Sequence, residues 1–353
     1  MPFYNREEDI RRMKAVLSGE PNLVYFVYGP INSGKTALLM KVLEELPEEY
    51  RVFYINFRGL ETSRYEDFVR ALFTVRYQGV WEKIKEKGDL LLGGVKFLEE
   101  VAKKLNYTLP VPRELLRALV RGEEGEMDCF KYLEEVMRRL VERGKKPVFV
   151  LDELQMLREV KKDGPVLHDL FNFLVRMTKE THLTHCLCAT SDCLFVEEAY
   201  SNARLEGRAK YLLVDDLTRD KAYEVYEGFG FEDKELVWDY IGGKVGDMVI
   251  LFEGKKQGYK EREALTRMLR DEKRRLRWML RLVEEGEKAG PSIKELKEVL
   301  KVFRERKEVE DIELKGRCLK FLIEENILFY NPVEGTVRLQ SRLLERAVME
   351  LIS

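Results

Sequence analysis

The sequence predicts an α/β protein whose parallel sheet is followed by a helical segment and then by a small unit that contains a β-hairpin. Three observations lead to this fold class. Short apolar segments alternate with helical patterns up to about residue 217, only helical periodicity follows to about residue 285, and a hairpin signal lies between helices near the end. Strands that are apolar throughout are typical of a parallel sheet covered on both faces.

Apolar segments of strand length, rich in β-branched and aromatic residues, recur five times in the first part of the chain. They cover residues 23–28, 52–56, 147–151, 185–190 and 211–214. Helical patterns lie at residues 7–17, 36–46 and 166–179, and residues 65–143 are expected to be mostly helical, with breaks near 93–94 and 110–112. This alternation predicts strands that lie parallel to one another.

The pattern changes after residue 217, and a separate unit begins near Pro291. Ser292 and Glu295 form a capping box for a helix that should extend to about residue 307. A helix at 314–325, a hairpin at 327–330 and 336–339 with its turn at 331–335, and a last helix follow. This order predicts a winged-helix unit, and we divide the chain into residues 1–217, 218–288 and 289–353.

The composition limits the classes of protein that this chain can be. It has 353 residues, of which 45% are hydrophobic and 36% charged, with a formal net charge of −2. This charge creates no overall field that would attract nucleic acid. Lys and Arg outnumber Asp and Glu from residue 255 onward, which suits a DNA partner and a solvated helical surface equally well. No secretory leader or membrane-spanning run is evident, so we expect a cytoplasmic protein.

Eight consecutive residues match the pattern G-x-x-x-x-G-K-[ST] of a phosphate-binding loop, between an expected strand and an expected helix. They are Gly29, Pro30, Ile31, Asn32, Ser33, Gly34, Lys35 and Thr36. In such a loop, backbone N–H groups surround phosphate oxygens, and the helix directs its positive end at them. We therefore expect Lys35 to bind the β and γ phosphates of a nucleotide, and Thr36 to bind Mg²⁺.

Two carboxylates, Asp152 and Glu153, end the expected strand 147–151. In P-loop NTPases an acidic residue at this place holds Mg²⁺, which makes Asp152 the second candidate metal ligand. A neighbouring glutamate can polarise the attacking water, so Glu153 is our candidate general base. Two acids after a strand could also simply face solvent. Together with the phosphate loop, they predict a P-loop NTPase that hydrolyses its nucleotide.

Five further polar residues are candidates for contacts with the phosphates. Thr190, Ser191 and Asp192 end the fourth expected strand, where Thr190 could contact the γ-phosphate or these residues could cap a turn or helix. Arg204 and Arg208 precede the fifth strand. Either arginine could stabilise the transition state, in the same chain or from a neighbouring subunit, or be an ordinary surface residue.

With these motifs, the chain resembles the archaeal ATPase family, which is related to the AAA+ and STAND branches of P-loop NTPases. The resemblance covers nearly the whole chain. The phosphate loop matches, residues 151–155 (LDELQ) are similar to the family's acidic strand motif, and residues 189–191 stand where the family has a polar sensor segment. It implies an AAA+-like P-loop sheet with a helical lid and a C-terminal winged-helix domain, and ATP or ADP with Mg²⁺ as ligands.

Looser likenesses to the same family imply roles for other residues. Residues 3–8 (FYNREE) are similar to an aromatic-x-Arg-Glu element that lies near the adenine, which implies nucleotide contact for Arg6. Residues 207–208, followed by a strand, resemble the family's next landmark and include Arg208. Residues 242–243 resemble the Gly-Gly-x-Pro element of the lid, but this chain has Val245 where the proline is usual.

Three functions fit this architecture. The first is an ATP-driven motor or switch that binds double-stranded DNA through its winged helix. The second is a STAND-like signalling switch, in which ATP controls assembly with a protein partner through the winged helix. The third is a nucleotide-binding scaffold, against which Glu153 argues because a pure binder needs no general base. The oligomeric state is not predicted by the sequence.

Two groups of basic residues are candidates for contacts with DNA. A DNA-reading helix should carry Lys, Arg, Asn or Gln on one exposed face, and helix 314–325 offers Lys315, Arg317 and Lys320. A basic cluster at residues 273–277 could bind DNA or form a solvated face.

Two tryptophans, Trp238 and Trp278, lie on helical patterns. We therefore expect both of them in the core rather than on a ligand platform.

Overall fold

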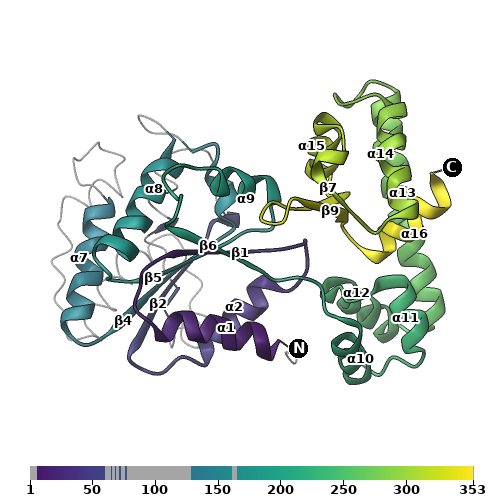
Figure 1. Cartoon of the computed structure of the whole chain (residues 1–353). Coiled ribbons are helices and arrows are strands. Elements are labelled where there is room, and N and C mark those ends of the chain that lie inside the picture. The colour runs from purple at the N-terminus through teal and green to yellow at the C-terminus, as the bar shows by residue number, and fades with distance from the viewer. Residues whose placement is uncertain are drawn as a thin grey trace.

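The computed structural model describes residues 6–59, 129–160 and 165–352, together with the single residues 65, 68, 71, 72, 76 and 77. A six-stranded sheet with helices on both faces forms the first half, and a second, mainly helical half follows its last strand (Figure 1). This confirms the α/β class. Among the described residues, no helix is long and apolar enough to cross a membrane.

The sheet has the strand order β3-β2-β4-β5-β1-β6, and its strands are parallel except for β3, which is antiparallel to β2. The strands are β1 Val24–Tyr28, β2 Tyr50–Asn56, β3 Arg76–Tyr77, β4 Lys146–Asp152, β5 His185–Ala189 and β6 Ala209–Leu213. All five predicted strands are therefore present. The short strand β3 falls in the segment predicted to be helical, and the predicted breaks near 93–94 and 110–112 lie outside the described residues.

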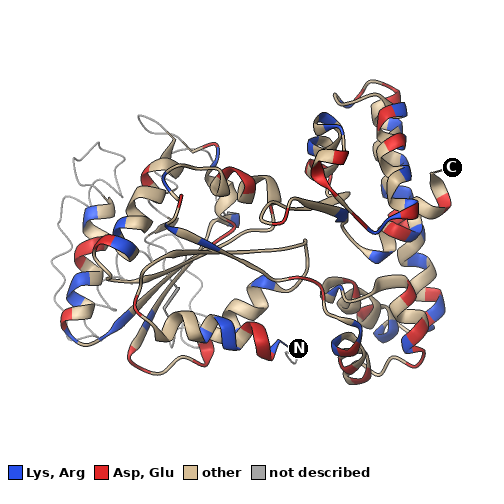
Figure 2. Cartoon of the chain, viewed as in Figure 1, with Lys and Arg blue, Asp and Glu red and all other residues tan. Residues whose placement is uncertain are grey.

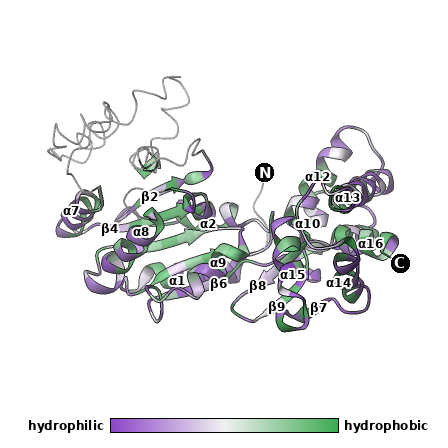
Figure 3. Cartoon of the chain, turned by 90° about the horizontal axis from the view of Figure 1, so that it is seen from above, coloured by the Kyte–Doolittle hydropathy of each residue, from purple (hydrophilic) through white to green (hydrophobic). Residues whose placement is uncertain are grey.

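Helices cover both faces of this sheet. On one face lie α1 (Glu7–Ser18) and α2 (Lys35–Glu44), and on the other lie α7 (Cys129–Glu142), α8 (Val166–Val175) and α9 (Cys193–Tyr200). Successive strand residues alternate between the two cores: Val27 and Val148 belong to the first, whereas Phe26 and Phe149 belong to the second. Burial on both sides explains why the strands are apolar throughout (Figure 3).

Short helical segments complete this half of the chain. They are the 3₁₀ turns η1 Phe57–Gly59 and η2 Leu154–Leu157 and the π-helical turn η3 Arg176–Glu180, which continues α8. Helix α9 was not predicted from the sequence. It begins where Asp192 accepts a hydrogen bond from the backbone N–H of Phe195, 2.9 Å away, so the cap interpretation of residues 190–192 is confirmed for Asp192.

The second half contains four helices followed by the predicted winged-helix order. The elements are α10 Arg219–Gly228, α11 Lys234–Ile241, α12 Val245–Lys256, α13 Glu261–Glu284, α14 Ile293–Glu305, β7 Glu308–Glu310, η4 Asp311–Glu313, α15 Gly316–Glu324, β8 Leu328–Asn331, β9 Thr336–Leu339 and α16 Arg342–Leu351. The capping box of Ser292 and Glu295 is present. Strand β9 pairs with both β8 and the unpredicted strand β7, and both pairings are antiparallel.

One continuous hydrophobic core joins the four helices to the winged-helix unit. Leu276 and Leu280 of α13 belong to the same cluster as Leu344 and Val348 of α16. The boundary near residue 288 therefore separates elements that share a core, and it stays a prediction. The expectation for Trp278 was wrong: its side chain is 58% exposed, because it lies on the face of α13 opposite to the buried leucines.

Candidate functional site

The phosphate loop, residues 29–36, connects β1 to α2 at the carboxyl edge of the sheet. A Cβ atom at Gly29 would collide with the backbone carbonyl of Val214, so only glycine fits beside the end of β6. Gly34 caps α2 in the left-handed region, with φ of +95°, and Asn32 has φ of +61°. These turns curl the loop around the start of α2, as phosphate binding requires.

Lys35 is buried at the base of this loop, with 8% of its surface exposed. Its ammonium donates to the carbonyl oxygens of Gly29 and Pro30, at 3.0 and 2.7 Å. Burial and, to a smaller extent, the nearby ammonium of Lys244 together lower the pKa of Lys35 to about 8, while Glu153 acts in the opposite direction. An anionic phosphate oxygen is a better hydrogen-bond acceptor than a carbonyl oxygen, so a bound phosphate should stabilise this buried ammonium strongly.

The two predicted Mg²⁺ ligands lie side by side. The hydroxyl of Thr36 donates to Oδ2 of Asp152 at 3.1 Å, and the phenol of Tyr54 donates to the same oxygen at 2.6 Å. The backbone N–H of Glu153 donates to Oδ1 at 3.0 Å. A hydroxyl and a carboxylate at this spacing are the oxygen ligands that Mg²⁺ prefers, so these side chains fit the metal.

Glu153 follows with its backbone in the left-handed region, at φ of +59°. Arg58, in the turn η1 that follows β2, forms a hydrogen-bonded ion pair with one carboxylate oxygen, and Nε2 of Gln155 donates to the other at 2.6 Å. The hydroxyl of Thr190 in turn donates to Oε1 of Gln155 at 2.7 Å. Thr190 is therefore connected to Glu153 through Gln155, and its own predicted contact with a phosphate stays a prediction.

Arg6 bridges the phosphate loop to the segment after β6. One of its nitrogens donates to the carbonyl oxygens of Ser33 and Asp215, at 2.5 and 2.7 Å, and the other contacts Asp9 at 3.1 Å. The predicted aromatic neighbours of Arg6, at residues 3 and 4, lie outside the described residues. Its predicted place beside the adenine stays a prediction.

The start of α12 packs against the outer side of the phosphate loop. The ammonium of Lys244 donates to the carbonyl of Ile31 at 3.0 Å and pairs with Asp216 at 3.2 Å. The backbone N–H of Gly246 donates to the carbonyl of Asn32 at 3.0 Å. A Cβ atom at Gly246 would lie 2.5 Å from Cβ of Asn32, so glycine permits this close approach.

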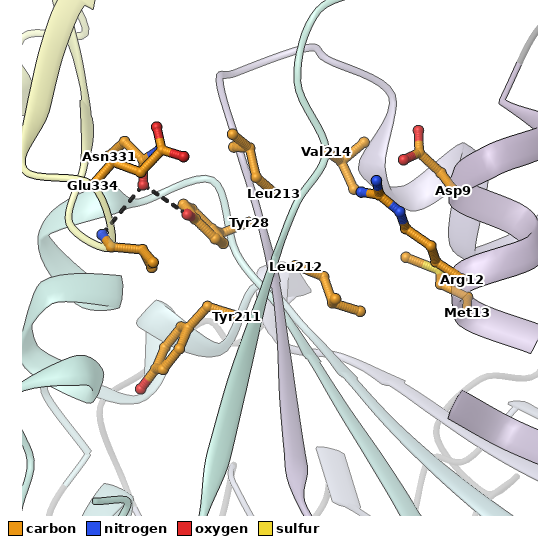
Figure 4. A pocket seen from close by; sticks show the side chains of 11 residues that line it. Asp9, Arg12, Met13, Tyr28, Tyr211, Leu212, Leu213, Val214, Asn331 and Glu334 are labelled. Carbon is orange, nitrogen blue, oxygen red and sulfur yellow. Dashed lines mark hydrogen bonds between the residues drawn. The ribbon is translucent and has the colours of Figure 1, made fainter. Parts of the chain in front are cut away.

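The hairpin of the winged helix contacts the same edge of the sheet. The phenol of Tyr28 donates to Oδ1 of Asn331 at 2.7 Å, and Arg338 of β9 forms an ion pair with Asp215. A cavity of about 220 Å³ lies beside this contact, between α1, the end of β6 and the hairpin turn (Figure 4). Arg12 and Glu334 face this cavity from its two sides.

Arg208 lies at the other end of the sheet from the phosphates. Its carbonyl accepts from the backbone N–H of Val24, where β1 begins, and its guanidinium donates to the carbonyl of Arg204. Strand β1 spans five residues, or about 16 Å, before the loop begins. Arg208 is thus remote from the site of its own chain, and only a role toward another copy stays a prediction.

Several residues of this site were not predicted. Tyr54 lies on β2 and Arg58 on the turn η1 that follows it, and their roles depend on the pairing of β2 with β4, which the sequence alone does not reveal. Asp215 and Lys244 lie far along the chain from the phosphate loop. Lys244 is the variable residue of the Gly-Gly-x-Pro-like element, and that position was the only available signal.

Sequence comparisons place this site in a known family. Residues 3–251 match the family described as an ATPase domain predominantly from Archaea, and residues 262–352 match the C-terminal domain of MJ1010-like uncharacterized ATP-binding proteins. The uncharacterized ATP-binding protein MJ0075 of Methanocaldococcus jannaschii is 38% identical over 364 residues, which cover 100% of this chain and 99% of its own. PYRAB09480 of Pyrococcus abyssi is 38% identical over 355 residues, with 99% and 98% covered.

Solved structures agree on the fold. The Walker-type ATPase PABY2304 of Pyrococcus abyssi superimposes with a TM-score of 0.65 at 16% identity, over 98% of this chain and 96% of the other. The ADP form of the ORC2 protein of Aeropyrum pernix gives a TM-score of 0.51 at 12% identity, over 100% and 96%. At these identities the likeness supports the fold alone.

Proposed function

Because this chain belongs to the family of ATPase domains found predominantly in Archaea, we propose that it is a Mg²⁺-dependent ATPase in which the nucleotide switches the position of its lid and winged helix. One observation supports the proposed switch. The phosphate loop is contacted directly by the start of α12, through Lys244 and Gly246, and is linked to the hairpin through Arg6 and Asp215. We place the protein in the cytoplasm, where ATP is available.

Each residue around the loop has a separate role in ATP hydrolysis. Lys35 binds the β and γ phosphates, and Thr36 and Asp152 hold Mg²⁺, which neutralises phosphate charge when it is bound. Glu153 accepts a proton from the attacking water. Arg58 and Gln155 fix the direction of its carboxylate, each through one oxygen. Side chains fixed in this way lose little freedom when the reaction occurs.

The switch begins at Lys35. Its ammonium donates to two carbonyls of the loop, and phosphate oxygens compete for those bonds. A change in the loop alters the carbonyls of Ile31 and Asn32, which accept from the lid, and the carbonyl of Ser33, which accepts from Arg6. The lid and the hairpin thus respond to the same ligand, as expected for a two-state element that a nucleotide biases.

We favour a protein over double-stranded DNA as the partner of the winged helix. Lys315 pairs with Glu295 and Glu298, and Lys320 pairs with Glu324, so these cations near α15 are already partnered. The hairpin also packs on the ATPase half. Duplex DNA remains the second candidate because Arg317 is exposed beside these lysines.

The test compares wild type with Glu153→Gln, and uses Glu159→Gln, an exposed glutamate, as the matched control. Loss of a general base should lower Mg²⁺-dependent ATP turnover about 10²- to 10⁴-fold while ATP binding persists. The control should behave like wild type. Full turnover in Glu153→Gln would contradict the assignment of the base, and identical scattering profiles with ADP and with a non-hydrolysable ATP analogue would contradict the switch.

Duplex DNA added to the same assay decides between the two partners. Stimulation of turnover that weakens steeply with salt would support DNA, because phosphate contacts release counterions. Turnover that is unchanged by DNA would support the protein partner.

A further inference from the structure

The outer face of α13 carries a stripe of arginines that the ATPase mechanism does not use. This 24-residue helix, Glu261–Glu284, joins the lid to the winged helix (Figure 1). Its inner face is buried by leucines such as Leu265, Leu269 and Leu276. Its outer face is open to solvent. Figure 2 shows that Lys and Arg recur along the helix.

The stripe consists of Arg270, Arg274, Arg277 and Arg281, all exposed. Their spacing of four, three and four residues places them on one face of the helix. At 1.5 Å per residue the stripe is about 16 Å long. Trp278 lies one turn after Arg274, at the edge of the same face.

Three of the four arginines in this stripe have no ion-pair partner within the described part of the chain. Arg281 pairs with Glu285, and beyond the other end of the stripe Arg267 pairs with Glu263. No ion pair is found among the described residues for Arg270, Arg274 or Arg277.

Most other cations of α13 differ in this respect. Lys273 pairs with Glu350 of α16, and Arg275 pairs with Glu272. Asp271 borders the stripe and is the only acidic residue at its edge between residues 266 and 281.

Trp278 is the second unusual feature of this face. Its side chain is 58% exposed, and it makes no ring contact within the described residues. An exposed indole is a large apolar surface, and covering it is favourable. A planar ring flanked by arginines suits a ligand that has both flat rings and phosphates.

We propose that this face of α13 binds single-stranded nucleic acid, with the arginines along the phosphates and Trp278 stacked on a base. A single strand fits better than a duplex, because paired bases do not offer their faces for stacking. It also fits better than an acidic peptide, which supplies charge without a series of flat rings. The proposal is independent of ATP hydrolysis.

The same half of the chain offers a control surface. The exposed face of α14 carries Lys294, Lys297 and Lys301, interleaved with Glu298 and Glu305. These lysines lie at the same helical spacing, but acidic residues share their face. Three charge reversals there change the net charge as much as three on α13.

The experiment measures binding of a labelled oligothymidylate to the full chain over a range of salt concentrations. Arg270→Glu/Arg274→Glu/Arg277→Glu should weaken binding and reduce the slope of log K against log salt by about 2, at about 0.7 per phosphate contact. Lys294→Glu/Lys297→Glu/Lys301→Glu should leave the slope near that of wild type. ATP turnover without oligonucleotide should be unchanged in both variants.

Tryptophan emission provides a second readout that does not depend on the charge variants folding. Binding should quench wild-type emission, and Trp278→Phe should remove that change while most of the affinity remains. Trp278→Ala should lower affinity about tenfold, through loss of stacking.

Four results would overturn the proposal. They are no binding by wild type, equal losses in the two triple variants, an emission change that persists in Trp278→Phe, and competition by polyglutamate as strong as by oligothymidylate.

Discussion

The carboxyl edge of the sheet and the outer surface of the C-terminal half hold their charged residues in opposite ways. At the sheet edge, Asp152 is 3% exposed and accepts three hydrogen bonds. On α13, pairs such as Arg267 with Glu263 join exposed neighbours one turn apart. Exposed pairs contribute about 0–1 kcal/mol, whereas breaking a buried pair costs about 3–5 kcal/mol. We therefore expect the effect of a substitution to follow the burial of its contacts rather than the number of charges.

The largest effect is expected where the lid meets the sheet. A Cβ atom at Gly243 would collide with the backbone of Leu217, whose N–H donates to the carbonyl of Gly243 at 2.9 Å. Backbone cannot rotate away as a side chain can, so Gly243→Ala should cost about 3 kcal/mol, the upper end of the usual range for overpacking. The midpoint of denaturant unfolding measures this loss.

Gly254→Ala in the neighbouring helix α12 is the matched control. A Cβ atom at Gly254 would meet Cβ of Ala264 at 3.5 Å, which is an ordinary contact. Alanine is favoured over glycine within a helix by about 0.5–1 kcal/mol, so this variant should be as stable as wild type or more so. Equal destabilisation of the two variants would show that crowding against Leu217 does not determine the position of the lid.

The second effect depends on pH and concerns Asp247 in the first turn of α12. The pKa of this carboxyl is raised from 3.8 to about 7, mainly by burial and to a smaller extent by the carboxylates of Asp216 and Glu272, while Lys244 acts in the opposite direction. The native state therefore binds the proton more tightly than the unfolded state. The free energy of unfolding of the protein should therefore fall as pH rises from about 4 to 7 and then stay low.

Asp247→Asn should remove this fall in stability. The pKa change sets a ceiling of about 4 kcal/mol. Because the variant also loses attraction to Lys244, we expect a gain on the order of 2 kcal/mol at pH 8 and none at pH 4. Asp220→Asn, at an exposed aspartate of α10, should show no such dependence. Parallel pH profiles for wild type and Asp247→Asn would refute the assignment.

The third effect links the lid to the phosphate loop through Lys35. With a pKa of about 8, Lys35 loses its charge as pH rises through that value, and ATP affinity should fall with it. Lys244→Met removes a neighbouring positive charge and should move the fall in affinity to higher pH. Lys255→Met, at the opposite end of α12 from the phosphate loop, should leave it in place. ATP titrations between pH 7 and 10 measure the shift. Superimposable affinity profiles for wild type and Lys244→Met would show that Lys244 does not affect the charge of Lys35.

How much of this site the sequence could predict depended on how local each part is. The phosphate loop occupies eight consecutive residues, so its pattern identified both the turn and the chemistry. The acidic pair at 152–153 was predicted because parallel strands present their carboxyl ends at one edge. The same rule places Arg208, which precedes its strand, at the opposite edge of the sheet, so its distance from the phosphate loop of its own chain followed from the sequence as well.

The contacts that join the halves could not be predicted, because their residues are distant in sequence and carry no shared pattern. Lys244 and Ile31 are 213 residues apart, and Tyr28 and Asn331 are 303 apart. The exposure of Trp278 could have been predicted. It follows Arg274 by four residues, and a helix that buries its leucines must turn that face outward.

The smallest effect on stability is expected at the hairpin. Measuring ATP affinity as well shows whether the contact between the hairpin and the sheet is coupled to nucleotide binding. Arg338 and Asp215 are both partly exposed, so Arg338→Ala should cost at most about 1 kcal/mol of stability. Arg306→Ala removes a similarly exposed pair, with Glu313, inside the winged-helix unit and should cost about as much. Only Arg338→Ala should change ATP affinity, because Asp215 also accepts from Arg6, which contacts the phosphate loop. A change of several-fold in that variant alone would mean that the hairpin is linked to the nucleotide. Unchanged ATP affinity in both variants would mean that the hairpin contacts the sheet without being coupled to nucleotide binding, and that the lid alone responds to the phosphates.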